Sequence, residues 1–86
     1  MMSLILYSTA GCHLCELAEA QLEEARQNFD LHWQWMEIVD SEELMERYSI
    51  RIPVLVEPES GEELGWPFNQ ADLQLWISRV LTSSST

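Results

Sequence analysis

The chain has 86 residues, enough for one small domain whose core is of marginal size. Fifteen acidic residues against four arginines give a formal net charge of −11, which disfavours nucleic acid and anionic membranes as partners because both require a basic patch. The sequence has no recognisable signal peptide and no apolar run of the roughly 20 residues that span a bilayer, and two cysteines are too few for a disulfide-rich secreted scaffold. We therefore expect a cytoplasmic, monomeric protein.

The first half of the chain predicts two strands separated by a helix. Residues 4–7 are apolar and predict a strand, which ends in a turn at residues 8–11. Residues 12–28 carry apolar and charged side chains at helical spacing. Residues 31–39 predict a second strand, and its apolar side chains on both faces indicate that helices cover both sides of the sheet.

The second half predicts a short helix followed by a hairpin. Asp40 is the expected N-cap of the short helix, which ends near Tyr48. Residues 53–56 and 62–68 predict two strands joined by a turn at residues 58–61, where proline, serine and glycine are concentrated.

Asn69 is expected to cap a last helix, which runs from Gln70 to about Leu81. Residues 1–81 are therefore interpreted as one domain, and the polar residues 82–86 as a flexible tail. The order β-α-β-α-β-β-α predicts an α/β fold with a four-stranded mixed sheet. Its first two strands should be parallel because a helix connects them, and its last two antiparallel because a tight turn does.

The only two cysteines stand at the start of the first predicted helix, in the sequence Cys12-His13-Leu14-Cys15. At this spacing the two sulfurs are close enough to share a disulfide. The free N–H groups and the dipole of the helix start favour a thiolate at Cys12; a protonated His13 would stabilise it further, whereas Glu16 would repel it. A strand, a turn and a helix that opens on C-x-x-C are typical of thioredoxin-like redox sites.

Two segments carry a resemblance to the glutaredoxin-like branch of the thioredoxin superfamily. Residues 7–16 read Tyr-Ser-Thr-Ala-Gly-Cys-His-Leu-Cys-Glu, and about 40 residues after the first cysteine comes Ile-Pro-Val-Leu at 52–55. The chain looks most like small bacterial glutaredoxin-like proteins of unknown substrate that share the first segment, and the likeness extends from Leu4 to Leu81. It implies a thioredoxin-like, glutaredoxin-type fold and a thiol–disulfide oxidoreductase in which Cys12 attacks a disulfide and Cys15 resolves the mixed disulfide.

The resemblance also implies roles for residues around the cysteines. Pro53 is expected to follow a cis peptide bond and to pack against the two sulfurs, which leaves the Ile52 backbone free to pair with a substrate strand. The residues expected to contact substrate are Tyr7, His13, Arg51, Ile52 and Trp66.

The chain departs from typical glutaredoxins in the groups that hold glutathione. Those proteins carry Gly-Gly after the fourth strand and a lysine near the redox motif, whereas this chain has Gly-Trp-Pro-Phe-Asn at residues 65–69 and no lysine. Pro67 has no N–H to donate to glutathione, and glutathione is an anion whereas the domain is strongly acidic. The acidic pair Glu62–Glu63 is interpreted as solvated surface. We therefore expect a protein or small-molecule disulfide as substrate and no cofactor, with glutathione left open as a co-substrate.

Two other functions stay open. Cys12, Cys15 and His13 offer soft ligands for zinc, copper or an iron–sulfur cluster, provided that a second chain, external thiols or a partner protein complete the set. The domain could also be a non-catalytic binding module. The first alternative predicts bound metal in protein purified without oxygen, and the second predicts partner binding that survives loss of both cysteines.

Overall fold

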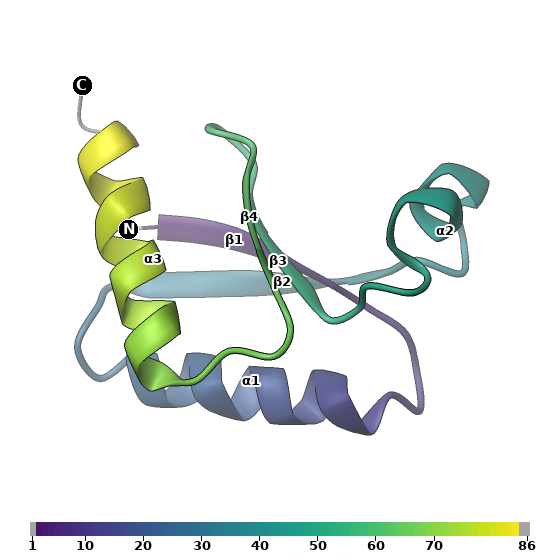
Figure 1. Ribbon diagram of the computed structural model, residues 1–86, viewed down its shortest axis with the longest axis horizontal. Coiled ribbons are helices and arrows are strands. Elements are labelled where there is room, and N and C mark those ends of the chain that lie inside the picture. Colours follow the sequence, from purple (N-terminus) through teal and green to yellow (C-terminus); the bar gives the residue numbers. More distant parts are fainter. Residues whose placement is uncertain (1, 85–86) are drawn as a thin grey trace.

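The computed structural model describes residues 2–84, and for residues 83 and 84 only the backbone. The predicted order of strands and helices is confirmed (Figure 1). The elements are β1 (Met2–Ser8), α1 (His13–Ala25), β2 (Leu31–Glu37), α2 (Glu42–Tyr48), β3 (Val54–Glu57), β4 (Glu62–Gly65) and α3 (Gln70–Ser84).

The sheet is the predicted four-stranded mixed sheet, with strand order β2-β1-β3-β4. β1 is parallel to β2 and antiparallel to β3, and β3 is antiparallel to β4. The β3–β4 connection is closed by the Gly61 N–H, which donates to the Glu57 carbonyl oxygen at 2.8 Å. Gly61 has φ of +77°, a left-handed conformation that glycine adopts without steric cost.

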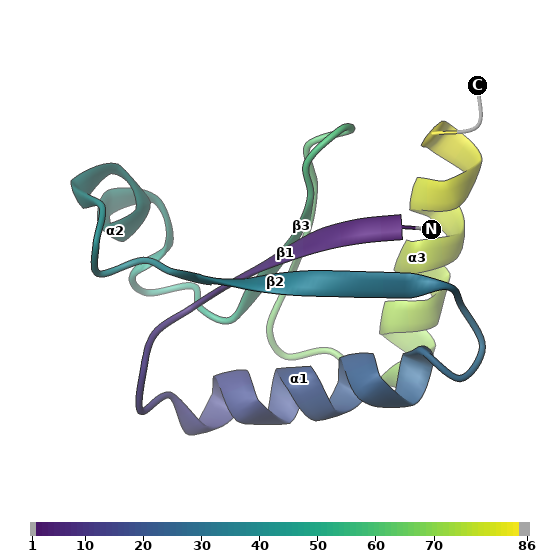
Figure 2. The same cartoon turned by 180° about the vertical axis from the view of Figure 1, so that it is seen from behind.

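The larger core cluster lies on the face of the sheet that α1 and α3 cover. Leu4 and Leu6 of β1 point into it and are at most 2% exposed, together with Leu22 of α1 and Ile77 of α3. Figures 1 and 2 show α1 running alongside the sheet and α3 standing at the end where β1 begins. The apolar side of each helix therefore faces the side of the sheet to which every second residue of β1 points, as expected for helices packed in one layer on a sheet.

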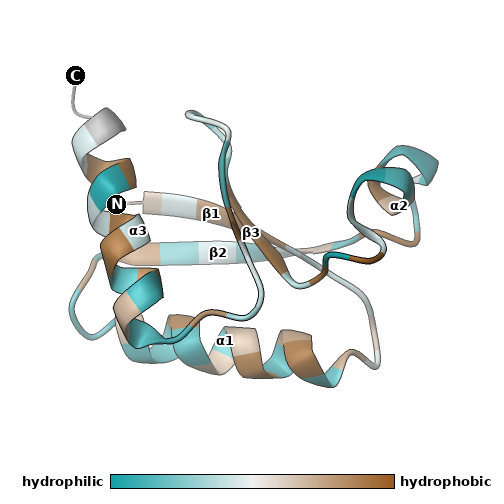
Figure 3. Ribbon diagram, in the orientation of Figure 1, coloured by the Kyte–Doolittle hydropathy of each residue, from teal (hydrophilic) through white to brown (hydrophobic). Residues whose placement is uncertain are grey.

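A smaller cluster lies on the opposite face of the sheet. It contains Val54 and Val56 of β3 with Ile38 and Tyr48, and Leu44 of α2 packs against it. Helices thus pack on both faces, as predicted, but α2 covers only the end of the sheet where β1 and β2 finish (Figure 1). Figure 3 shows the contrast between hydrophobic β3 and mostly hydrophilic α2. On β1 and β2, the side chains left exposed on this face are Ser3, His32 and Gln34.

The first predicted helix and the second predicted strand are shorter than expected. α1 stops at Ala25 instead of Asn28, because the following N–H groups turn back to the Glu24 and Ala25 carbonyl oxygens and close a tight turn. β2 stops at Glu37 because the chain bends at Ile38, whose N–H still donates to the Ser8 carbonyl oxygen at 3.0 Å.

The prediction of Asp40 as a helix cap is wrong. Asp40 lies in a turn that the Ser41 N–H closes by donating to the Ile38 carbonyl oxygen at 3.1 Å. Ser41 is the N-cap of α2 instead, and its Oγ accepts the Leu44 N–H at 3.2 Å. The chain enters the helix one residue later than predicted, at a residue type equally suited to the cap position.

The last hairpin and helix also differ from prediction at their ends. β3 begins at Val54 rather than at the proline, and β4 ends at Gly65 rather than at residue 68. Asn69 caps α3 as predicted, since its Oδ1 accepts the Asp72 N–H at 2.9 Å. The helix continues to Ser84, so residues 82–84 of the predicted tail are helical, and residues 85–86 lie outside the described part of the chain. Within residues 2–84, no helix has both the length and the apolar character needed to cross a membrane.

Candidate redox site

Cys12 and Cys15 form a disulfide across the first turn of α1, with their Cα atoms 5.2 Å apart. Cys12 is the N-cap of the helix, and its Sγ accepts the backbone N–H of Cys15 at 3.1 Å. Cys15 is completely buried, whereas Cys12 is partly exposed. The solvent-exposed surface of the pair therefore belongs to Cys12, and Cys15 is shielded from solvent.

The turn before Cys12 is held by a hydrogen bond within its own backbone and by hydrogen bonds to a residue of β2. Gly11 has φ of +81°, and the Cys12 N–H donates to the Thr9 carbonyl oxygen at 3.2 Å. Glu37 reaches this turn from the end of β2, where its Oε1 accepts Thr9 Oγ1 at 2.8 Å and the Ala10 N–H at 3.4 Å. Sequence reasoning missed Glu37. The one sequence feature that could have indicated Glu37 is its position as a carboxylate at the end of the strand that pairs with β1.

Strand register places Pro53 beside the end of β1 from which the chain turns to Cys12. Tyr7 is paired with Val54, the first residue of β3, so Pro53, which directly precedes that strand, lies toward the same end. Pro53 is buried, the Ile52–Pro53 peptide bond is cis, and the Pro53 carbonyl oxygen accepts the Trp66 N–H at 3.1 Å. The backbone thus brings the segments that hold these predicted site residues to one end of the sheet.

Arg51 is engaged by neighbouring side chains. It forms an ion pair with Glu63 of β4, and its guanidinium lies 5.4 Å from the centre of the Tyr48 ring. Tyr48 Oη donates to the other carboxylate oxygen of Glu63 at 3.1 Å, and the Tyr48 ring stacks on Tyr7 at 4.5 Å between centroids. Glu63 lies on the surface, as interpreted from the sequence, but the hairpin also carries it to Arg51, a contact that the sequence did not predict.

The Arg51 contact also changes the acidity of these groups. The hydrogen bond from Arg51, with a smaller contribution from Tyr48, holds the pKa of Glu63 below its usual value. Burial, and then the carboxylate of Glu63, raise the pKa of Tyr48. At neutral pH Glu63 is ionised and Tyr48 is a neutral hydrogen-bond donor, which is the combination that the observed contacts need.

The other predicted site residues lie in more ordinary surroundings. His13 is well exposed, and its Nδ1 lies 3.5 Å from a carboxylate oxygen of Glu16, also exposed. Trp66 is half-buried and packs edge-on against Phe68 with ring centroids 5.1 Å apart. Ile52 is half-buried against the smaller core cluster.

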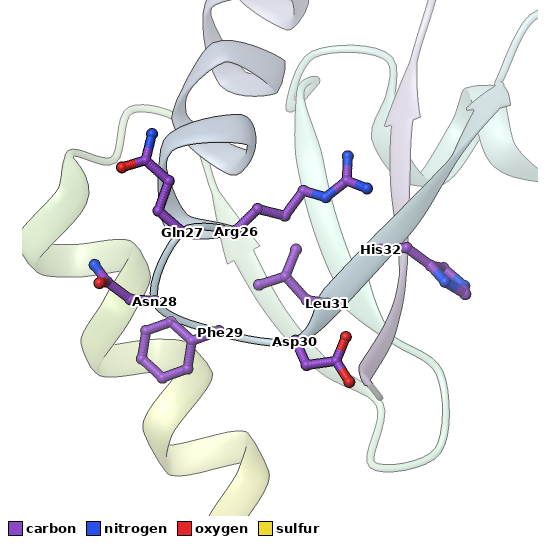
Figure 4. A pocket seen from close by; sticks show the side chains of 7 residues that line it. All are labelled: Arg26, Gln27, Asn28, Phe29, Asp30, Leu31 and His32. Atoms are coloured by element: carbon purple, nitrogen blue, oxygen red, sulfur yellow. The ribbon is translucent and has the colours of Figure 1, made fainter.

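A hollow on the surface lies away from the cysteines, where α1 leads into β2 (Figure 4). It is lined by residues 26–32, and no predicted site residue is among them. In the part of the chain that the structure describes, no three or more His, Cys, Asp or Glu side chains are grouped as a metal site would require. A metal at Cys12 and Cys15 would therefore need ligands from another molecule.

Comparison with known proteins agrees with this arrangement. The family model described as Glutaredoxin-like domain (DUF836) matches residues 3–78. The X-ray structure of the structural genomics target protein XcR50 from X. campestris is 37% identical, with a TM-score of 0.79 over 88% of this chain and 96% of that one. The solution structure of protein Ne2328 from Nitrosomonas europaea is 26% identical, with a TM-score of 0.77 over 87% of this chain and 89% of that one.

A more distant likeness is to thioredoxin 1 from Thermosipho africanus. It is 13% identical, with a TM-score of 0.68 over 99% of this chain and all of that one, and so supports the thioredoxin-like fold alone. No curated protein sequence matches the chain.

Proposed function

The chain belongs to the family described as Glutaredoxin-like domain (DUF836), and on that premise we propose that it is a thiol–disulfide oxidoreductase acting on a protein or small-molecule disulfide. One observation carries the proposal. Cys12 and Cys15 are paired at the start of α1, with Cys12 partly exposed and Cys15 buried. This asymmetry suits Cys12 for attack on a substrate disulfide and Cys15 for resolution of the mixed disulfide.

In the proposed cycle, the reduced protein passes two electrons to its substrate. The Cys12 thiolate attacks one sulfur of the substrate disulfide, forming a mixed disulfide, and the other substrate sulfur leaves as a thiolate that takes up a proton. Cys15 then loses its proton and attacks the Cys12 sulfur, which closes the disulfide observed here and releases the second substrate thiol. A dithiol, or two equivalents of a small thiol, is needed to reduce the pair again.

The residues around the sulfurs support this cycle in different ways. The backbone N–H groups at the start of α1 stabilise a thiolate on Cys12 and lower its pKa relative to a free thiol. We assign Pro53 to packing against the sulfurs and Ile52 to backbone pairing with an extended substrate. Tyr7, His13 and Trp66 are assigned to the rim that the substrate contacts. The protein would work as a monomer in the cytoplasm, where a lone C-x-x-C serves redox chemistry more often than structure.

Equilibration with glutathione buffers of graded potential, followed by alkylation and intact-mass measurement, tests the proposal. A two-electron transition between dithiol and disulfide is expected in the wild type. Cys15→Ser should accumulate a mixed disulfide, and Cys12→Ser should form none because its remaining sulfur is buried. Thiols that stay free throughout the range, or exchange that survives Cys12→Ser, would refute the oxidoreductase proposal.

A further inference from the structure

Arg51 is the arginine placed by the chain next to the proposed site, since it lies two residues before Pro53. Arg47, in the last turn of α2, also acts on the side chains around Arg51, since it hydrogen-bonds Tyr48 and adds a smaller contribution to the lowered pKa of Glu63. Arg26 sits at the opposite end of α1, where it pairs with Glu23 at 3.0 Å, and Arg79 lies on α3. An anionic small thiol such as glutathione needs a cation to receive its carboxylates, and a guanidinium with a free edge is well suited to that task. Whether Arg51 is free therefore bears on which disulfides the site accepts.

Glu63 pairs with one nitrogen of the Arg51 guanidinium, which stays partly exposed, and is itself held in place. One of its carboxylate oxygens pairs with Arg51, and the other accepts Tyr48 Oη at 3.1 Å. Tyr48 is buried and stacked on Tyr7, so its hydroxyl has little freedom to move away. Displacing Glu63 from Arg51 would cost both contacts at once.

The Glu63 carboxylate also opposes anionic substrates directly. The pKa of Glu63 is held below its usual value, first by the Arg51 hydrogen bond, so the group keeps its charge at neutral pH. A substrate carboxylate that approached Arg51 would meet a charge of the same sign that is already paired with it. Glu63 therefore disfavours anionic ligands in two ways, because it pairs with the Arg51 cation and repels a second anion.

We propose that Glu63 determines substrate specificity, by pairing with Arg51 so that the Cys12–Cys15 site reacts with neutral or cationic disulfides in preference to anionic ones. The inference rests on the proposed oxidoreductase function and narrows its substrate class. It favours disulfides in protein segments that are uncharged or basic, in keeping with the net charge of −11.

The test uses three small disulfides of different charge and the reduced full-length protein. The probes are dithiodipropionate as the anion, hydroxyethyl disulfide as the neutral compound and cystamine as the cation. The quantity to measure is the ratio of the oxidation rate with the anion to that with the neutral probe. Dividing each variant's ratio by that of the wild type cancels the intrinsic reactivity of the probes.

Glu63→Gln should raise the anion-to-neutral ratio on the order of fivefold, the size expected for one partly exposed charge contact. The matched control is Glu62→Gln, which makes the same change in net charge one residue away on the opposite face of β4. Its ratio should stay near that of the wild type. The double variant Arg51→Gln with Glu63→Gln should lose the gain, because the freed cation is no longer present. Tyr48→Phe, which removes one anchor of Glu63 and keeps the ring stack, should give a smaller rise.

The outcomes separate this inference from the oxidoreductase proposal. If Glu62→Gln raises the ratio as much as Glu63→Gln does, net charge alone is responsible and the specificity role of Glu63 is refuted. If the double variant, whose net charge equals that of the wild type, keeps the gain, the pairing of Glu63 with Arg51 is not its cause and the proposal is also refuted. If the wild type is oxidised by none of the three probes, the oxidoreductase proposal itself fails.

Discussion

Glu37 Oε1 lies 2.8 Å from Thr9 Oγ1, so the last residue of β2 is bonded to the turn that carries the chain from β1 into the cysteine pair. The same oxygen also accepts the Ala10 N–H. Strand pairing explains why this residue can act there, since Glu37 is the β2 partner of Ser8. The turn has few other anchors, so the carboxylate is expected to be important for its position.

Glu37→Ala should lower the free energy of unfolding of the oxidised protein by about 1–2 kcal/mol, because the substitution removes a partly buried, charge-assisted acceptor. Urea unfolding followed by circular dichroism measures the change. Glu24→Ala, an exposed glutamate on α1, serves as the control and should change stability by only a few tenths of a kcal/mol. Equal losses in the two variants would show that the Glu37 contacts contribute nothing specific.

Ser8 presents the opposite case, a buried polar group without a partner. It is fully buried on β1, and its Oγ makes no hydrogen bond within the described residues. Because an unpaired hydroxyl is costly to bury, Ser8→Ala should leave the free energy of unfolding unchanged or raise it by up to about 1 kcal/mol. Leu6→Ala, two residues earlier on the same face of β1, should lower it by about 2–5 kcal/mol because it opens a cavity. A loss above about 1 kcal/mol for Ser8→Ala would show that the hydroxyl is stabilising.

Local patterns were sufficient to predict the order of the elements and the cysteine pair. Cys12, Cys15 and the cap at Asn69 depend on residues within a few positions of each other, which can be read directly from the chain. Glu37 and Glu63 could not be found in this way, because their partners are 28 and 12 residues away and meet them only through strand register. Register follows from packing of the whole sheet, and a one-residue slip would turn either glutamate to the other face.

Prediction from local sequence also failed at the N-cap of α2 and at the end of α3. Asp40 and Ser41 are both good cap residues, and the turn that closes on Ile38 decides between them. Serine and threonine at residues 82–84 suggested a tail, yet the helix continues through them. Propensity at a helix end is a weak determinant when the preceding turns are already packed on the core.

Glu63 should make the stability of the protein depend on acidic pH. Its pKa in the folded protein is lowered, mainly by Arg51, so the ionised form is favoured by folding. The stabilisation is therefore present above the ordinary carboxyl pKa of 4.5 and is lost as the pH falls through the lower folded value. The difference in unfolding free energy between wild type and Glu63→Gln should be constant from about pH 7 to pH 5.5 and shrink below about pH 4.5. A difference that stays constant down to pH 3 would contradict this role for the ion pair.

Gly11 and Gly61 allow the turn before the cysteines to be tested against a matched turn elsewhere. Both have positive φ, +81° and +77°, and a Cβ added at either would meet no atom within 4 Å. Replacing either by alanine should therefore cost about 1–2 kcal/mol of unfolding free energy through backbone strain alone, and less with asparagine. Only Gly11→Ala should also change the reaction rate of Cys12 with an alkylating reagent, because only that turn sets the start of α1. If Gly61→Ala altered the thiol reactivity equally, the effect would follow from general destabilisation and not from the geometry of the turn at Gly11.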